Sequence, residues 1–334
     1  MPTSPDQSAS IRAGIPLAQY LALALTWGTS FLFIKVGLEG LSPGQVVLAR
    51  MILGTCALAA VVLLGRRRLP RDPAVWGHLA IVGSLLCVIP FLLFSWAELR
   101  IPSGLASVLN ATTPLMTILV ATVAIKAERL GAAHLTGLVL GFTGVLVVFA
   151  PWSATAASPT QGDDLLAKAA CLVATLCYGI AFVWLRRFIA PRRLPAIPTA
   201  FIQVGLGTLI LLPLTPWLGA SPVTLTPRVV WSMLALGMLG TGLAYVWNTN
   251  IVNAWGAVRA STVTYLTPLV GVVAGAVILG EPVPPSSVVG GVVIITGIVI
   301  GNGAWRPLLH AIARNRPEPD RPHGPRPAEK TETP

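Results

Sequence analysis

The chain has 334 residues, of which only 10% are charged and 54% are hydrophobic, and its formal net charge is +11 with a mean hydropathy of +0.76. About a quarter of the residues of an ordinary soluble domain are charged, so this composition excludes a soluble globular enzyme. The cations form short clusters between long apolar runs rather than one basic face of a folded domain. No nucleic-acid partner is therefore expected, and the pattern is typical of a protein embedded in the lipid bilayer.

The apolar runs predict an all-α integral membrane fold with ten transmembrane helices. Each run is close to the roughly 20 residues that a helix needs to cross about 30 Å of hydrocarbon. Their continuity favours helices, since the strands of a membrane barrel alternate polar and apolar residues. In chain order, the predicted spans are residues 16–38, 44–64, 76–98, 102–125, 132–151, 165–185, 197–218, 229–251, 257–279 and 286–304.

The spans divide the chain into an N-terminal segment 1–15, two five-helix halves 16–151 and 165–304, and a tail 305–334. The first apolar run has no basic region before it and nine more runs after it, so we do not interpret it as a cleavable signal peptide. The tail is rich in Pro, Arg, Glu and Asp without apolar periodicity. It is expected to be disordered and to lie in the cytoplasm.

The distribution of Lys and Arg predicts the orientation in the membrane. With the N-terminus inside, most of the 23 Lys and Arg residues fall in the inner connections and in the tail, including Arg66–Arg68 and Arg186–Arg187. Basic residues are enriched on the cytoplasmic side of membrane proteins. We therefore expect a multi-pass protein of the cytoplasmic (plasma) membrane with both termini in the cytoplasm.

The sequence carries no signal for a metal site, a cofactor or catalysis. All four cysteines, Cys56, Cys87, Cys171 and Cys177, fall inside predicted spans without metal-ligand spacing, and we interpret them as small buried hydrophobes. The chain contains no HExxH, Walker loop or dinucleotide fingerprint. An integral-membrane enzyme is therefore a weak alternative.

The two halves of the chain resemble each other. The first half contains LALALTWGTSFLFIKVG, which aligns with LVATLCYGIAFVWLRRF in the second. Three further segments align in the same order with an offset of about 150 residues: ARMILGT with IQVGLGT, ASVLNATTPL with ASTVTYLTPL, and GLVLGFTGV with GGVVIITGI. The alignment places Arg50 opposite Gln203 and Pro114 opposite Pro268.

Because each repeat contains an odd number of spans, the second must enter the membrane from the opposite side. The result is an inverted-topology repeat. Such repeats are found in transporters, because two mirrored halves can rock about a central site and open it to each side in turn. The repeat therefore favours a secondary transporter that works by alternating access.

The motifs of both halves also resemble a known family. They are WGTSFLFIKVGLEGLSP, SGLASVLNATTPLMTILVATVAIKAERL and GLVLGFTGVLVV, and later AVRASTVTYLTPLVGVVAGAVILGEPV and GGVVIITGIVIG. In order and duplication they resemble the EamA-type ten-helix transporters of the drug/metabolite transporter superfamily over roughly residues 16–304. The resemblance implies a carrier of small metabolites, but family members differ widely in what they transport.

Polar residues inside the spans are candidates for binding the small-molecule substrate, since they should face the interior of the bundle. In span 4, Ser107, Asn110 and Pro114 share one helical face, and span 9 offers Thr264, Tyr265 and Pro268. Each proline leaves a backbone carbonyl without its helical partner. Those carbonyls could bind substrate, or neighbouring Ser and Thr hydroxyls could satisfy them.

The remaining candidates come from the other central spans. They are Trp27 and Ser30 in span 1, Arg50 in span 2, Trp96 in span 3, Tyr178 in span 6, Gln203 in span 7, and Thr241, Tyr245 and Asn248 in span 8. An apolar, aromatic cavity with a few hydrogen-bonding groups suits a small amphipathic metabolite. Trp96 lies near a span end, where an interfacial aromatic residue is the favoured interpretation.

Charged residues are scarce within the spans, and Arg50 is the one that is hardest to explain. A structural ion pair with Glu98, or snorkelling to the interface, competes with contact to an anionic substrate. The small four-helix multidrug relatives carry an essential membrane glutamate in span 1, but span 1 here contains no carboxylate. The residues therefore give no support for proton exchange.

Spans 5 and 10 each carry a glycine-rich face. Gly137, Gly141 and Gly144 in span 5, and a matching set in span 10, permit close helix approach. Packing within one molecule is the default explanation, and a homodimer through spans 5 and 10 is the alternative. The function expected from all these features is export of small metabolites, with a passive channel or a lipid-flipping protein as the alternative.

Overall fold

The structure, a computed structural model, describes residues 5–124, 132–149, 161–218, 221–255 and 263–301. Within these ranges every regular element is a helix, and no β-strand occurs. Seven helices are long and apolar enough to cross a membrane, and the shorter apolar helices Ala132–Val148, Val263–Leu279 and Pro285–Gly301 accompany them. The all-α prediction is confirmed for this part of the chain, whereas the predicted tail 305–334 lies outside the described residues.

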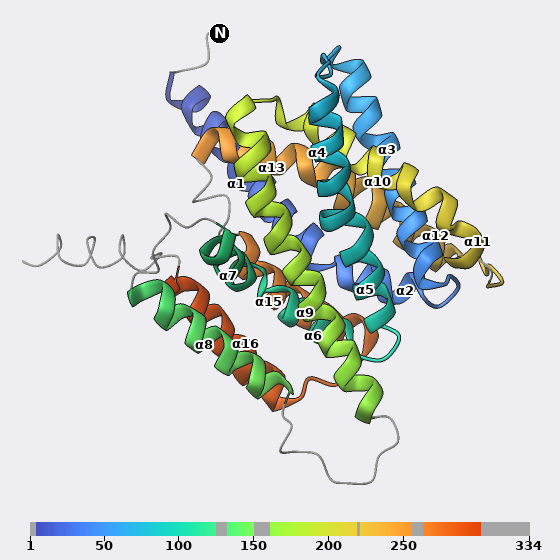
Figure 1. The fold of residues 1–334 in the computed structure, drawn as a ribbon, viewed down its shortest axis with the longest axis vertical. Coiled ribbons are helices and arrows are strands. Elements are labelled where there is room, and N and C mark those ends of the chain that lie inside the picture. Colours follow the sequence, from blue (N-terminus) through green and yellow to red (C-terminus); the bar gives the residue numbers. More distant parts are fainter. Residues whose placement is uncertain (1–4, 125–131, 150–160, 219–220, 256–262, 302–334) are drawn as a thin grey trace, which may run out of the picture.

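Figure 1 shows these helices as one bundle in which the chain crosses back and forth. The α-helices are α1 (Pro5–Gly28), α2 (Ser30–Gly37), α3 (Pro43–Leu64), α4 (Pro73–Gly83), α5 (Ile89–Ala97), α6 (Ser103–Asn110), α7 (Thr113–Ala124), α8 (Ala132–Phe149), α9 (Gln161–Trp184), α10 (Ala196–Leu211), α11 (Thr215–Leu218), α12 (Pro227–Leu234), α13 (Ala244–Trp255), α15 (Val263–Leu279) and α16 (Pro285–Gly301). Wider π-helical turns form η1 (Ser84–Val88), η3 (Leu185–Ile189) and η6 (Ala235–Leu243), and short 3₁₀ turns form η4 (Ala190–Arg192) and η5 (Leu212–Leu214).

π-Helical turns interrupt the third and the eighth predicted spans at corresponding places. In the third span, η1 joins α4 to α5 just before Pro90. Proline has no N–H to donate to the carbonyl of Leu86, and the wider turn re-registers the chain so that the Ile89 N–H donates to the Ser84 carbonyl. In the eighth span, η6 joins α12 to α13 through a glycine-rich segment. Such π-helical turns are frequent at functional sites.

Pro114 and its counterpart Pro268 each leave one backbone carbonyl without its helical partner, and the same kind of contact satisfies it in both places. Pro114 cannot donate to the Asn110 carbonyl, and Thr113 Oγ1 donates to that carbonyl instead at 2.8 Å. Pro268 lies inside α15, and Thr267 Oγ1 donates to the Thr264 carbonyl at 3.0 Å. In both repeats the threonine before the proline thus satisfies the carbonyl that the proline leaves without a partner.

Helices α8 and α16 lie side by side at one edge of the molecule (Figure 1). A Cβ atom on Gly297 would lie 2.6 Å from the Gly137 carbonyl oxygen, and one on Gly144 would lie 2.7 Å from the Gly290 carbonyl oxygen. Distances this short leave room for glycine alone. The glycine faces of the predicted spans 5 and 10 therefore pack against each other within one chain, which was the default expectation.

The outward faces of the helices are apolar, as in a bundle surrounded by lipid. Large exposed side chains include Leu21, Leu25, Leu135, Val139, Val288 and Val292. The four cysteines are free, and Cys56 is exposed, which corrects its interpretation as a buried residue. Its side chain lies on the outer surface of α3 because the inner surface of that helix is occupied by Arg50, Gly54 and Leu58.

Replacing Gly297 with alanine should separate α8 from α16, because the backbone atoms of the partner helix cannot move aside for a methyl group. We expect Gly297→Ala to lower the free energy of unfolding by about 1–3 kcal/mol, the usual effect of overpacking. The matched control is Gly77→Ala, since a Cβ atom there meets nothing within 4 Å. Thermal unfolding of the purified proteins in detergent checks this, and equal Tm values for the two variants would contradict the packing.

Candidate substrate site

Helix α3 and the π-helical segment η6 approach so closely that their backbones nearly touch. A Cβ atom on Gly54 would lie 2.6 Å from Thr241 Cγ2, and one on Gly237 would lie 2.5 Å from Leu53 Cβ. Small residues on both helices are what permits such an approach. As a consequence, Thr241 of the second half lies directly against Arg50 of the first.

Arg50 lies at this contact between α3 and η6 and makes few polar contacts. Its side chain is 8% exposed, its Nε donates to Thr241 Oγ1 at 2.9 Å, and its guanidinium carbon lies 3.6 Å from the centre of the Phe91 ring. Within the described residues it forms no salt bridge and no other hydrogen bond. The expected ion pair with Glu98 is therefore absent, and burial excludes snorkelling to the interface.

Polar and aromatic side chains of both halves lie near the guanidinium. Gln203 Nε2 donates to the Tyr245 hydroxyl at 3.4 Å and to Cys87 Sγ at 3.7 Å, and Tyr178, Cys87 and Tyr245 lie close enough to Arg50 to interact with it electrostatically. We name this group the Arg50 cluster: Arg50, Cys87, Phe91, Tyr178, Gln203, Thr241 and Tyr245. Both halves contribute to it, and its members Cys87 and Thr241 belong to the two π-helical turns.

Trp27 and Ser30 adjoin the Arg50 cluster through Gly240, which precedes Thr241 in η6. Trp27 Nε1 donates to the Gly240 carbonyl at 3.2 Å. A Cβ atom on Gly240 would lie 3.2 Å from Ser30 Oγ, and that hydroxyl donates to the Thr26 carbonyl at 2.8 Å. Both predicted residues thus lie beside the cluster, with their own hydrogen bonds already formed.

The candidates on spans 4 and 9 have structural contacts instead. Ser107 is fully buried, and its hydroxyl donates to the Thr267 carbonyl at 3.2 Å, which joins α6 to α15. The carbonyls freed by Pro114 and Pro268 accept from the preceding threonines, as described above. Of the two alternatives for these carbonyls, the geometry therefore supports satisfaction by neighbouring hydroxyls.

The remaining predicted residues are only partly buried. Asn110 ends α6, Asn248 lies three residues after Tyr245 on α13, and Thr264 and Tyr265 lie in the first turn of α15. Trp96 packs beside the apolar core, and the Arg100 guanidinium lies 4.1 Å from its ring centre. That contact near the end of α5 fits an interfacial aromatic residue better than a substrate contact.

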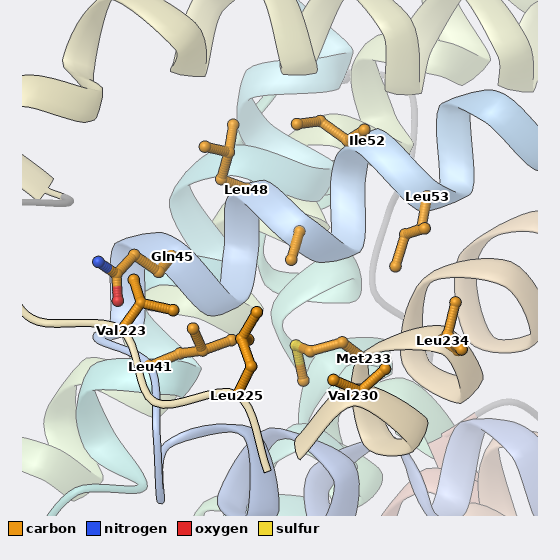
Figure 2. A pocket seen from close by; sticks show the side chains of 11 residues that line it. Leu41, Gln45, Leu48, Ile52, Leu53, Val223, Leu225, Val230, Met233 and Leu234 are labelled. Carbon is orange, nitrogen blue, oxygen red and sulfur yellow. The ribbon is translucent and has the colours of Figure 1, made fainter. Parts of the chain in front are cut away.

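A separate apolar hollow of about 370 Å³ opens on the other side of α3 (Figure 2). Its lining includes Leu48 and Ile52 of α3, Leu225 of the segment before α12, and Met233 of α12. Leu48 and Ile52 each lie two positions from Arg50, on the opposite face of the helix. The hollow is therefore distinct from the Arg50 cluster and faces outward.

Sequence reasoning did not identify Phe91 and Cys87 as members of the site. Phe91 is one of several apolar residues in the segment IPFLLF, and nothing in the sequence separates the ring that covers Arg50 from its neighbours. The nearby Pro90 is the one available signal, because a proline within a span points to an irregular turn. Among the described residues, no group of three or more His, Cys, Asp or Glu could hold a metal ion.

Comparisons with known proteins agree on one family. The EamA-like transporter family matches the chain twice, over residues 13–150 and 165–302. A protein of Streptantibioticus cattleyicolor named "Probable terminal-alkyne amino-acid exporter" is 30% identical over 83% of this chain and 90% of its own length. An Escherichia coli protein named "Probable amino-acid metabolite efflux pump" is 25% identical over 84% of this chain and 92% of its own length. A crystal structure with 20% identity has a TM-score of 0.60 and covers 89% of this chain and 99% of the other, which is a likeness of fold alone.

Replacing Thr241 with valine should remove the acceptor of the Arg50 Nε–H and keep the shape of the side chain. A hydrogen bond to a charged group contributes about 1.5–3 kcal/mol, so we expect Thr241→Val to lower the free energy of unfolding by that amount. The control is Thr143→Val, whose hydroxyl is exposed and bonds to the Val139 carbonyl of its own helix. Thermal unfolding in detergent distinguishes them, and a Tm for Thr241→Val equal to that of the control would contradict the assignment.

Proposed function

Because the chain belongs to the EamA-like transporter family, we propose that it is an exporter that moves small amphipathic metabolites across the cytoplasmic membrane by alternating access. The multi-pass membrane character of the family agrees with the apolar helices of the described residues. The repeat supports the mechanism, because the family matches each half separately. Two mirrored halves with a shared central site can expose that site to each side in turn.

The proposed architecture is ten transmembrane helices in two inverted repeats, with both termini in the cytoplasm. The matching π-helical turns η1 and η6, and the matching threonine–proline pairs of α7 and α15, support a common design of the halves. The excess of Lys and Arg on the inner side supports the orientation. A homodimer through spans 5 and 10 would have to use the outward faces of α8 and α16, since their glycine faces contact each other.

The proposed substrate is a small metabolite with a carboxylate, and the observation that carries this proposal is the incomplete pairing of Arg50. A guanidinium offers five N–H donors in a fork that fits a carboxylate, yet the single hydrogen bond described for Arg50 uses Nε. The donors left over suit a substrate carboxylate. Phe91, Tyr178 and Tyr245 would then contact its apolar part, which is consistent with relatives named as exporters of amino acids and their metabolites.

Counterflow of radiolabelled amino acids and their derivatives in proteoliposomes tests this proposal. Losing a charge-assisted hydrogen bond of about 1.5–3 kcal/mol corresponds to a fall in affinity of roughly 10- to 100-fold, which we expect for Arg50→Gln. The matched control is Arg228→Gln, because Arg228 pairs with Glu39 at the surface. Wild-type transport by Arg50→Gln would remove Arg50 from the site.

The same assay separates a carrier from a passive channel or a lipid-flipping protein. A carrier gives saturable uptake that is stimulated by substrate on the opposite side, whereas single-channel current would refute a carrier. Asn110→Ala and Tyr245→Ala should each depress transport and leave membrane expression intact. Unchanged transport in both variants would exclude these two residues from the substrate path.

The proposed topology predicts opposite accessibility for two exposed connections, 65–72 and 221–226. In a background without native cysteines, Ser221→Cys should react with a membrane-impermeant maleimide in intact cells. Arg67→Cys should react only after the cells are permeabilised, because its connection lies in the cytoplasm. Labelling of both positions in intact cells would contradict the inverted arrangement.

A further inference from the structure

Glu98 is a buried carboxyl group for which the proposed substrate site has no use. It lies at the C-terminal end of α5, directly after Ala97. Its side chain is 0% exposed, and neither carboxylate oxygen has a hydrogen-bond partner in the described part of the chain. Ser95, in the preceding turn of the same helix, also has a buried hydroxyl without a partner.

Glu281 provides the contrast, because it is a carboxylate whose oxygens are fully engaged. It accepts hydrogen bonds from the Ser103 N–H at 2.9 Å, the Ser103 hydroxyl at 2.8 Å and the Gly104 N–H at 3.2 Å. These donors form the first turn of α6, where the helix dipole favours a negative charge. Both carboxylate oxygens of Glu281 therefore have hydrogen-bond donors, whereas those of Glu98 have none.

The cations near Glu98 form their hydrogen bonds with groups other than its carboxylate. Lys35 Nζ donates to the backbone carbonyl of Glu98 and, at 3.1 Å, to that of Ile101, so it caps the end of α5 rather than the carboxylate. Arg50 contacts Thr241 and Phe91 instead. The titratable and charged groups whose fields reach Glu98 are Lys35 of α2, Arg50 of α3, Cys171 of α9 and Glu281 after α15, and none of them bonds to its side chain.

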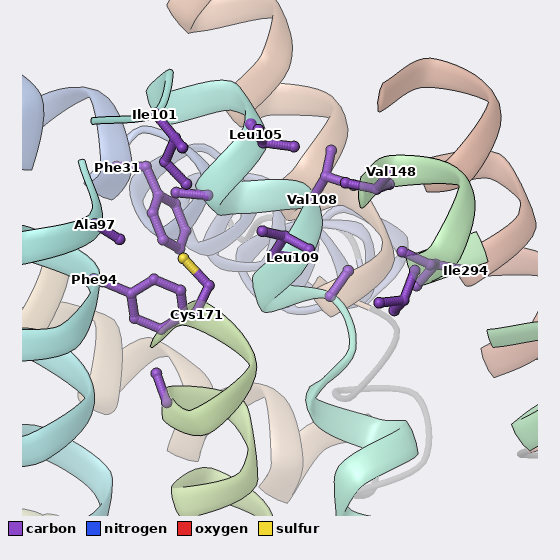
Figure 3. Close-up of a cluster of buried hydrophobic side chains, with 14 of the residues drawn as sticks. Phe31, Phe94, Ala97, Ile101, Leu105, Val108, Leu109, Val148, Cys171 and Ile294 are labelled. Atoms are coloured by element: carbon purple, nitrogen blue, oxygen red, sulfur yellow. The ribbon is translucent and has the colours of Figure 1, made fainter. Parts of the chain in front are cut away.

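Buried apolar side chains flank Glu98 along the chain. Its neighbours along the chain, Ala97 and Ile101, belong to a buried cluster with Phe31, Phe94 and Cys171 (Figure 3). The Phe31 and Phe94 rings lie 5.4 Å apart with their planes nearly perpendicular. An ionised carboxylate in such surroundings, and at the negative end of a helix, is far less stable than the neutral acid, which loses much less solvation on burial.

We propose that Glu98 is a proton-binding site: it holds a proton in the packed arrangement described here and releases that proton to water when the expected outer side opens. On opening, the carboxyl O–H bond breaks, its electron pair stays on the carboxylate, and the proton passes to water. Because a protonated Glu98 stabilises the packed state, low pH favours that state and rising pH favours opening. The consequence, that transport responds to a pH gradient, rests on the proposed transport function.

A proton is the occupant that the chemistry favours. A metal ion would need several ligands at once, and among the described residues no group of His, Cys, Asp or Glu could supply them. The amine of a bound substrate is the competing occupant. It would require an ionised Glu98, which the experiment below detects directly.

Infrared spectroscopy of the purified protein without substrate tests the proton site. The wild type at neutral pH should show the C=O stretching band of a protonated carboxyl group, which shifts with ¹³C-labelled glutamate and disappears in Glu98→Gln. The matched controls Glu281→Gln and Glu39→Gln should keep the band, because Glu281 is fully hydrogen-bonded and Glu39 is exposed and paired with Arg228. Absence of the band in the wild type, or its survival in Glu98→Gln, would overturn the proposal.

If Glu98→Gln does not fold, Glu98→Met offers an apolar side chain of about the same length, and the isotope shift identifies a glutamate band without any substitution. In proteoliposomes, the counterflow rate of the wild type should change with pH, and that of Glu98→Gln should stay the same over this range. Loss of substrate binding in Glu98→Gln without a protonated band in the wild type would assign Glu98 to the substrate. Because the spectrum needs no transport, the proton site and the proposed function can fail independently.

Discussion

A polar group inside this bundle of apolar helices must find its hydrogen-bond partner within the protein, because hydrocarbon offers none. In the described part of the chain, several side chains satisfy backbone groups that would otherwise lack a partner. Thr113 and Thr267 satisfy the carbonyls that the following prolines leave open. At the expected outer side, Lys35 caps the carbonyls at the end of α5, and Glu281 caps the N–H groups at the start of α6.

Against this background, Arg50 and Glu98 stand out as ionisable groups with incomplete pairing. Arg50 uses only its Nε–H in the hydrogen bond described and has further guanidinium N–H donors beside aromatic rings. Glu98 has a carboxyl group without any described partner. Both lie where helices of the two halves meet. Incompletely satisfied polar groups destabilise a resting protein, and they are also the groups that a ligand or a proton can stabilise. This is the physical basis of the two proposals.

Close backbone approach joins the halves at several places. The α3–η6 contact places Arg50 of the first half against Thr241 of the second, and the α8–α16 contact joins the last helix of each half through glycine. The α6–α15 contact adds the hydrogen bond from Ser107 to the Thr267 carbonyl. At these seams, small residues let the backbones of the two halves approach closely. Such seams are compatible with relative movement of rigid halves.

The sequence by itself determined the membrane class, the all-helical fold class, the repeat and the family, because apolar run length, charge bias and duplicated motifs are properties of order along the chain. It also selected Arg50, Gln203, Thr241 and Tyr245, which the fold brings together. Only the tertiary structure decided that Phe91 covers Arg50, that Ser107 and the proline carbonyls already have partners, and that Glu98 has none. Helical periodicity tells which residues share a face, but whether a polar atom on that face is satisfied depends on atoms that a distant segment brings to it.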